Sequence, residues 1–107
     1  MIPEVTPSEL RQRLDAPDPP LLLDVRTAEE RAWARIEPSL HIGLDEFLAR
    51  VGKEVPRDAD VVVYCHVGAR SAQAVMWMAA NGWERVRNLS GGIDAWSVDV
   101  DPSVPRY

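Results

Sequence analysis

The chain contains one cysteine, Cys65, at the point where an apolar run gives way to a helical pattern. The run is Val61-Val62-Val63-Tyr64, and the residues after the cysteine are His66-Val67-Gly68-Ala69-Arg70-Ser71. Loop amides and the positive end of a helix dipole stabilise a thiolate, or an anion bonded to it. Arg70 adds a fixed positive charge a few residues on. The pattern therefore predicts nucleophilic sulfur chemistry at Cys65.

A purely structural role for Cys65 is the alternative, because free cysteine is among the most frequently buried residue types. Two features of the loop favour function. Gly68 permits a backbone turn that points several amides inward, and Arg70 and Ser71 stand at the loop-to-helix junction, where an anion would be held. Sites in doubly wound sheets also lie outside the carboxyl ends of the strands. We therefore interpret Cys65 as a nucleophile.

Short apolar runs alternate with helical patterns, which predicts an α/β fold with a parallel sheet and covering helices. Thr6 and Thr27 are each followed three residues later by Glu, so each is expected to open a helix with a capping box. A further helix is expected from about Asp45 to Val51. The predicted strands are residues 21–25, 40–42, 61–64 and 85–89.

The helix that follows the Cys65 loop is expected from Ser71 to Asn81-Gly82, a good C-terminal signal. Its buried face is ambiguous in the sequence. One stripe is Ala72, Val75, Met76, Ala79 and Ala80, and the other is Ser71, Ala74, Val75 and Met78. Beyond the last strand we expect Gly91-Gly92, a short turn carrying Trp96, and a mostly irregular segment at 98–107.

The size and composition of the chain limit what it can be. With 107 residues it is expected to form one domain over 1–107. A net charge of −5 argues against nucleic acid as a partner. No apolar run approaches the ~18 residues that cross a membrane, and no secretion signal is visible. A single free thiol fits a reducing cytosol, so we expect a cytoplasmic protein without a membrane partner.

Three motifs resemble the rhodanese (thiosulfate sulfurtransferase) family. They are Leu22-Leu23-Asp24-Val25-Arg26 with Glu29-Glu30, Cys65-x-x-Gly68-x-Arg70-Ser71, and Leu89-x-Gly91-Gly92-Ile93-x-Ala95-Trp96. In this order and spacing they extend over residues 22–96. The resemblance implies a sheet of about five parallel strands with helices on both faces. It also implies a catalytic cysteine that cycles through a persulfide.

The chemistry implied by this resemblance begins when the Cys65 thiolate attacks the outer sulfur of a donor such as thiosulfate and sulfite leaves. The amides of residues 66–70 hold the terminal sulfur, and a thiol or cyanide acceptor then removes it. No metal or cofactor is needed. Matching family positions suggest that Arg70 orients an anionic donor or stabilises the persulfide. The alternative is that Arg70 braces the loop through backbone carbonyls.

In this interpretation His66 contributes its loop amide, and Asp24 and Arg26 have supporting roles. We expect His66 to be a solvent-facing loop residue, because adjacent residues on a tight loop rarely point the same way. Asp24 and Arg26 lie at the end of a neighbouring strand, near the site. They are expected to pair with loop or helix groups, Arg26 with Glu29 or Glu30.

The segment Ala34-Arg35-Ile36-Glu37-Pro38-Ser39 departs from the family pattern, in which Gly-His-Ile-Pro-Gly-Ala is usual. The histidine and both glycines are absent. We therefore expect a locally different connection before the strand at Leu40, and no chemistry from His41.

The length of the loop between Cys65 and Arg70 distinguishes sulfur transfer from the chemistry of a related enzyme class. Four residues separate Cys65 from Arg70, whereas phosphatases and arsenate reductases on the related fold have a longer loop, enlarged for a tetrahedral oxyanion. The shorter loop suits a single sulfur atom. A non-catalytic rhodanese-like binding module usually lacks the cysteine. A sulfur-relay carrier, fed by a desulfurase and passing sulfur to a protein partner, stays open, as do the physiological donor and acceptor.

Overall fold

A parallel sheet forms the centre of the computed structural model, which describes residues 2–107. In spatial order its strands are β1 (Glu4–Val5), β5 (Val86–Leu89), β4 (Val61–Tyr64), β2 (Leu21–Asp24) and β3 (Leu40–His41). Every neighbouring pair is parallel. The carboxyl ends of the strands therefore meet at one edge of the sheet, and the predicted five-stranded α/β architecture is confirmed.

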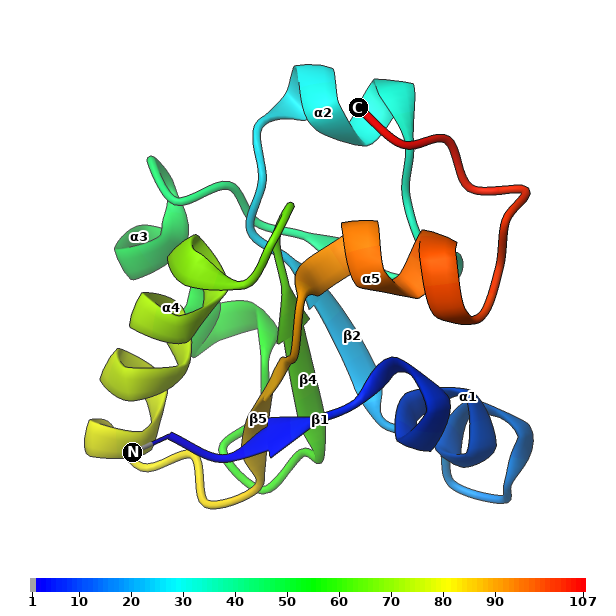
Figure 1. Cartoon of the computed structure of the whole chain (residues 1–107). Coiled ribbons are helices and arrows are strands. Elements are labelled where there is room, and N and C mark those ends of the chain that lie inside the picture. Colours follow the sequence, from blue (N-terminus) through cyan, green and yellow to red (C-terminus); the bar gives the residue numbers. More distant parts are fainter. Residues whose placement is uncertain (1) are drawn as a thin grey trace.

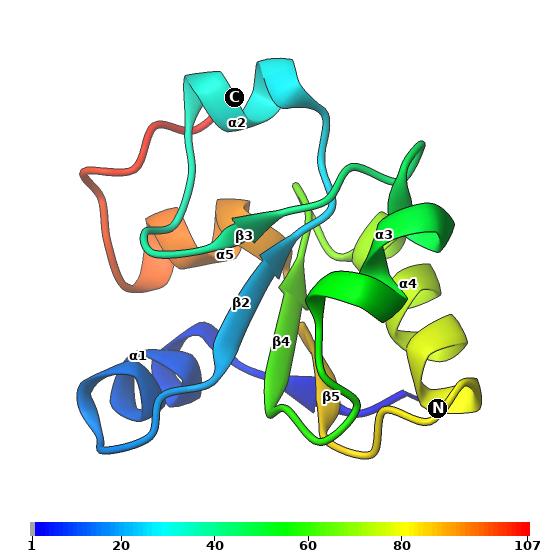
Figure 2. The same ribbon diagram turned by 180° about the vertical axis from the view of Figure 1, so that it is seen from behind.

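The helices lie on both faces of this sheet, as expected. They are α1 (Pro7–Asp15), α2 (Ala28–Trp33), α3 (Phe47–Glu54), α4 (Ala69–Ala80) and α5 (Gly92–Asp99). Helices α3 and α4 cover one face and α1 and α5 the other, while α2 lies beyond the carboxyl ends of the strands (Figures 1 and 2). The C-terminal segment runs back along this end and finishes beside α2 (Figure 1).

The first two helices begin where local hydrogen bonds predict. The Thr6 hydroxyl accepts from the Glu9 amide at 3.1 Å, and the Thr27 hydroxyl accepts from the Glu30 amide at 3.2 Å. In each case the glutamate side chain accepts from the threonine amide in return. Both predicted capping boxes are confirmed. They are predictable from sequence because the two partners of each box are only three residues apart.

Two helix boundaries and two further elements differ from the sequence prediction, apart from shifts of one residue at strand ends. Helix α3 is shifted to Phe47–Glu54, and α4 begins two residues early because Gly68, at φ +107°, serves as its N-cap. The expected turn around Trp96 is the helix α5, and β1 was not predicted. Strand β1 has two residues and pairs only with β5, so its pattern is too short to read from sequence.

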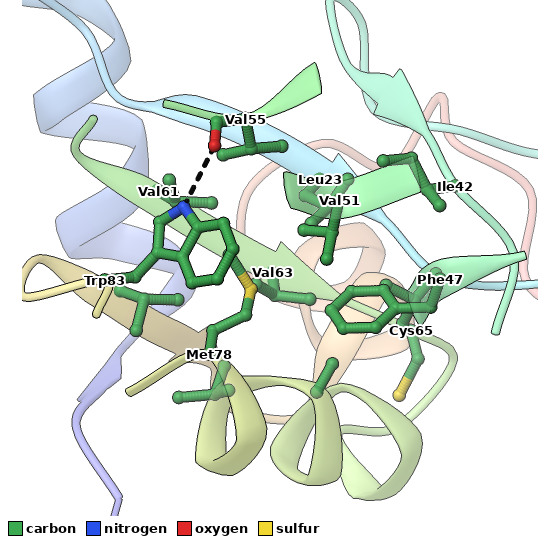
Figure 3. Close-up of a cluster of buried hydrophobic side chains, with 14 residues drawn as sticks. Leu23, Ile42, Phe47, Val51, Val55, Val61, Val63, Cys65, Met78 and Trp83 are labelled. Atoms are coloured by element: carbon green, nitrogen blue, oxygen red, sulfur yellow. Dashed lines mark hydrogen bonds between the residues drawn. The ribbon is translucent and has the colours of Figure 1, made fainter. Parts of the chain in front are cut away.

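Two apolar clusters hold the layers together, one on each face of the sheet. The cluster under α3 and α4 contains Leu23 and Val63 from the sheet, Phe47 from α3 and Met78 from α4 (Figure 3). Buried polar groups in it are paired; the Trp83 indole, for example, donates to the Val55 carbonyl at 3.2 Å. Figure 3 shows Trp83 and Cys65 toward opposite sides of this cluster, so Cys65 is anchored by core packing.

The second cluster packs α1 and α5 against the opposite side of the same strands. Leu10 from α1 and Trp96 from α5 meet Leu22 and Tyr64 from the sheet. Because β2 and β4 contribute alternate side chains to both clusters, they are buried on both faces, as their continuous apolar sequences predict. Within residues 2–107, no helix has the length and apolarity needed to cross a bilayer.

The packing of α4 resolves the ambiguity about its buried face. Ser71, Ala74, Val75 and Met78 are buried, whereas the Met76 side chain is 59% exposed. Two residues of the rejected stripe, Ala79 and Ala80, are also exposed. In this orientation of α4 the Ser71 hydroxyl lies 3.2 Å from Cys65 Sγ, so the site geometry depends on the rotation of the helix.

The two methionines of α4 provide a test of this packing. We expect Met78→Ala to lower the free energy of unfolding by about 2–5 kcal/mol, because it leaves a cavity in the core. Met76→Ala is the matched control and should change it by less than about 0.5 kcal/mol. Urea denaturation of both variants measures the difference. Equal effects would contradict the observed rotation of α4.

Candidate active site

The Cys65 side chain is buried directly beyond the last residue of β4. Its Sγ atom accepts hydrogen bonds from the Gly68 amide at 3.2 Å, the Ser71 amide at 3.3 Å and the Ser71 hydroxyl at 3.2 Å. All three donors lie at the start of α4, where the helix has unpaired N–H groups. The sulfur therefore lies where a negative charge is stabilised by dipoles.

Glycines let the backbone of this loop turn and let α5 approach it closely. Gly68 has φ +107°, a conformation that L side chains rarely adopt. On the other side of the loop, the Ile93 amide donates to the Cys65 carbonyl at 2.9 Å, and the Asp94 amide donates to the His66 carbonyl at 3.0 Å. A Cβ atom on Gly92 would lie 2.6 Å from the Cys65 carbonyl oxygen, which excludes any other residue there.

A buried asparagine, which sequence analysis missed, holds the other side of Ser71. Asn88 Nδ2 donates to the Gly68 carbonyl at 3.1 Å, and this places its Oδ1 atom 2.5 Å from the Ser71 hydroxyl. The single hydroxyl proton of Ser71 can point either to Asn88 or to Cys65 Sγ. Asn88 follows Val86 at a two-residue spacing, which places a polar side chain on the buried side of strand β5, and this was the available signal.

The environment of Cys65 favours the thiolate. Burial acts against ionisation, but hydrogen bonds from the Ser71 hydroxyl and from the amides of Ser71, Gly68 and Arg70 outweigh it and hold the pKa of the Cys65 thiol below its ordinary value. A lowered thiol pKa is typical of nucleophilic cysteines at helix N-termini. The loop can thus supply a thiolate without a neighbouring base.

The predicted cradle of amides is formed only in part around this sulfur. Of the loop residues His66, Val67, Gly68, Ala69, Arg70 and Ser71, Gly68 and Ser71 donate hydrogen bonds to Sγ, and the Arg70 amide also favours the charged sulfur. The side chains of Val67 and Ala69 face solvent, so these two residues offer only their backbone to a bound sulfur.

The Arg70 side chain forms an ion pair across the site. Its Nη1 and Nη2 atoms donate to the two carboxylate oxygens of Glu30 at 2.7 and 2.8 Å. The pair raises the pKa of Arg70 and, against the effect of burial, holds the pKa of Glu30 well below its usual range. The alternative that Arg70 braces backbone carbonyls is not what the structure contains; its partner is a carboxylate on α2.

Asp24 and Arg26 form a buried ion pair beside the site. Arg26 Nε and Nη2 donate to the two oxygens of Asp24 at 2.9 and 2.8 Å, and both side chains are fully buried. The predicted pairing of Arg26 with a helix group is confirmed only in part, because Arg26 donates to the Glu30 carbonyl, at 3.4 Å, while its carboxylate partner is Asp24 and not Glu29 or Glu30. Asp24 is two residues away on the same strand end and is the nearer partner.

Arg26 also anchors the atypical segment that precedes β3. Its Nη2 atom donates to the Ala34 carbonyl at 2.5 Å, and the Tyr64 hydroxyl accepts from the Ile36 amide at 3.2 Å. The peptide bond between Glu37 and Pro38 is cis. His41 Nε2 lies 2.7 Å from the Arg26 carbonyl oxygen, a structural contact within the strand layer.

His66 is half-buried rather than free in solvent, because the last residue of the chain covers it. The Tyr107 ring stacks on the His66 ring, with centroids 4.1 Å apart and planes 13° from parallel. The Tyr107 hydroxyl accepts from Arg26 at 2.9 Å and donates to Glu30 at 2.7 Å. Burial, with the Glu30 charge and against Arg26, raises the pKa of Tyr107 to about 12.

Tyr107 was missed because residues 98–107 have the composition of an irregular segment. Residues 101–107 lack helix and strand, which confirms the prediction for this part of the segment, whereas residues 98 and 99 belong to α5. Its contacts with the site join residues 77 and 81 positions apart. No local sequence signal reports contacts of this kind.

A cavity of about 520 Å³ opens beside these ion pairs. Its walls come from the segments after β2 and β3, and Arg70 contributes from the Cys65 loop. Charged and titratable groups on the wall include Arg26, Glu29, His41, Asp45 and Glu46. Within residues 2–107, no cluster of potential ligands could hold a metal ion.

Comparison with known families agrees with this geometry. The family model of the Rhodanese-like domain matches residues 6–99. The chain belongs to the rhodanese-like family. A sulfurtransferase of Allochromatium vinosum is 41% identical to it over 97 residues, covering 91% of this chain and 90% of that protein. The family therefore supports a sulfurtransferase-type enzyme with a sulfur donor and a sulfur acceptor.

Solved structures of rhodanese-like proteins superpose on this chain. A rhodanese-like domain protein from Staphylococcus aureus has a TM-score of 0.85 at 28% identity, covering 99% of both chains. The human single-domain sulfurtransferase TSTD1 has a TM-score of 0.78 at 28% identity, covering 92% of this chain and 98% of that one. Longer proteins also match: a tRNA uridine(34) hydroxylase of Xanthomonas euvesicatoria is 38% identical, and the match covers 44% of its length.

The Ser71 hydroxyl allows a test of how this rhodanese-like protein lowers the pKa of Cys65. In Ser71→Ala the pKa should rise, because one hydrogen bond to the thiolate is lost. Such a bond is worth about 1.5 kcal/mol, so alkylation by iodoacetamide at neutral pH should slow up to about tenfold. The rate-against-pH curve should move to higher pH.

Ser97→Ala is the control for the Ser71 variant, since it also removes a buried serine hydroxyl, one that donates to the Val104 carbonyl away from the loop. It should leave the alkylation curve unchanged. An unchanged curve in Ser71→Ala would mean that the Ser71 proton points only to Asn88.

Proposed function

We propose that this protein moves sulfane sulfur from a donor such as thiosulfate to a thiol or cyanide acceptor through a persulfide on Cys65. One observation carries the proposal: three donor groups of Gly68 and Ser71, two amides and a hydroxyl, lie within hydrogen-bond distance of Cys65 Sγ at the start of α4. These donors favour a thiolate before transfer and a charged sulfur bonded to it afterwards. The proposed catalytic unit is the single domain formed by residues 1–107.

The transfer proceeds in two displacements. The Cys65 thiolate attacks the outer sulfur of thiosulfate, the bond between the two donor sulfurs breaks, and sulfite leaves with the electron pair. The new terminal sulfur carries the negative charge, and the loop amides face it. A thiolate or cyanide then attacks this terminal sulfur, the Sγ–S bond breaks, and the Cys65 thiolate is regenerated. Neither step calls for a metal or a cofactor.

A phosphatase or arsenate reductase is the competing enzyme class. Two features count against it. The loop has four residues between Cys65 and Arg70, short for a tetrahedral oxyanion, and the Arg70 guanidinium is already paired with Glu30. Phosphoryl esters are therefore expected not to turn over.

A sulfur-relay role uses the same persulfide chemistry with other partners. In that role the donor is a desulfurase and the acceptor a biosynthetic protein, with thiosulfate only a laboratory donor. A free Cys65 thiol fits a reducing compartment such as the cytosol, which we propose as its location. The net charge of −5 supports neither nucleic acid as a partner nor an anionic membrane surface.

Intact mass spectrometry after incubation with thiosulfate tests the proposal. We expect a gain of one sulfur atom, lost when cyanide or a thiol is added. Cys65→Ala is the control and should show no gain, because the chain has no other cysteine. An adduct from a protein persulfide but not from thiosulfate would favour the relay role. The absence of an adduct with every sulfane donor would contradict the proposed function.

A further inference from the structure

The positive charge of Arg70 is already neutralised by the protein itself. Both terminal nitrogens of its guanidinium contact Glu30, at 2.7 and 2.8 Å. A bidentate pair of this geometry is the arrangement in which Arg binds a carboxylate most strongly. An anionic donor that is to use Arg70 must therefore displace Glu30 or compete with it.

Glu30 is held in this position from three sides. Its Oε1 atom accepts from the Thr27 amide at 3.1 Å, which closes the capping box of α2. Its Oε2 atom accepts from the Tyr107 hydroxyl at 2.7 Å. Tyr107 is fixed in turn by Arg26, at 2.9 Å, and by stacking on His66. The carboxylate is thus tied to α2, to the C-terminal segment and to the Cys65 loop.

The arginines near this pair are bound to carboxylates, so none of them is free to compensate an added dianion. Arg26 and Arg31 both contact Asp24, and the adjoining cavity wall includes the carboxylates of Glu29, Asp45 and Glu46. A small dianion close to the Cys65 thiolate therefore meets negative charge without a free arginine. A donor with less negative charge avoids most of this repulsion.

We propose that Glu30 is a specificity-determining residue, which occupies Arg70 as an internal counter-anion and selects against small dianionic oxyanion donors. The favoured donors are organic persulfides, whose leaving group is a thiolate bound to carbon and which need no arginine. In that transfer the Cys65 thiolate takes the terminal sulfur of R–S–SH, the S–S bond breaks, and R–S⁻ leaves. This inference rests on the persulfide chemistry of the proposed function.

Tyr107 is a positioning residue in this scheme. It touches no sulfur, but its hydroxyl keeps Glu30 facing Arg70. Removing the hydroxyl while keeping the ring preserves the stack on His66 and frees one side of Glu30. Tyr107→Phe should therefore weaken the selection without abolishing it.

The decisive variant is Glu30→Gln. Glutamine at this helix position keeps the capping interaction but removes the counter-charge, so Arg70 becomes available to thiosulfate. The second-order rate constant for persulfide formation from thiosulfate should rise about tenfold. The rise for benzenethiosulfonate, a monoanion, should be smaller, and alkylation by neutral iodoacetamide should change by less than about twofold. Tyr107→Phe should give a rise of about twofold with thiosulfate.

Glu9→Gln is the matched control. Glu9 has the same place in the capping box of α1 as Glu30 has in α2, and the substitution changes the net charge by the same amount. It should leave all three rates unchanged. In a protein that already carries Arg70→Ala, adding Glu30→Gln should not raise the rate with thiosulfate. The effect of Glu30 acts through Arg70, so it disappears when Arg70 is removed.

The outcomes separate this inference from the proposed function. If wild-type protein forms a persulfide but Glu30→Gln reacts with thiosulfate at an unchanged or lower rate, Glu30 only positions Arg70 and the inference is overturned. An equal gain with thiosulfate and iodoacetamide would also overturn it, since the change would then lie in Cys65 itself. If wild-type protein forms no persulfide with any donor, the proposed function fails instead.

Discussion

The backbone of the Cys65 loop has to point its N–H groups at one sulfur atom, and its carbonyls must then find partners elsewhere. Helix α5 provides those partners, since the amides of Ile93 and Asp94 bind the carbonyls of Cys65 and His66. The N-terminal amides of the two helices thus have different acceptors. Those of α4 donate to the sulfur, and those of α5 donate to the carbonyls of the loop. Gly92 makes the contact possible, because a side chain there would collide with the loop backbone. The reactive loop, the end of β4 and the start of α5 therefore form one unit.

The arginines around this unit are bound to carboxylates. Arg26 and Arg31 share the buried Asp24, and Arg70 is bound to Glu30 at the edge of the cavity. Stabilisation of a thiolate therefore comes chiefly from amide dipoles and the Ser71 hydroxyl, which act over a few ångströms and do not attract anions from a distance. Such a site suits a sulfur atom that arrives on a carrier better than one that arrives as a free dianion.

Much of the fold is predictable because the relevant interactions are local. Thr6 and Thr27 bind partners three residues away, and the runs at β2 and β4 are apolar throughout because both faces are covered. The failures have a common cause. The sequence of α5 predicts only a turn, because the first amides of this helix bind a loop more than 25 residues earlier and no local capping residue marks its start. The rotation of α4 depends on which of two similar apolar stripes packs against the sheet.

By itself, the sequence determined the candidate nucleophile, the length of its loop and the glycines that shape it, since these depend on residue type and on spacing along a short stretch. Only the tertiary structure decided what surrounds that loop. It paired Arg70 with Glu30 across 40 positions, set Asn88 behind Ser71 at a separation of 17, and brought Tyr107 onto His66. Contacts at such separations follow from how the strands and helices are packed, and neighbouring residues in the chain carry no signal of them.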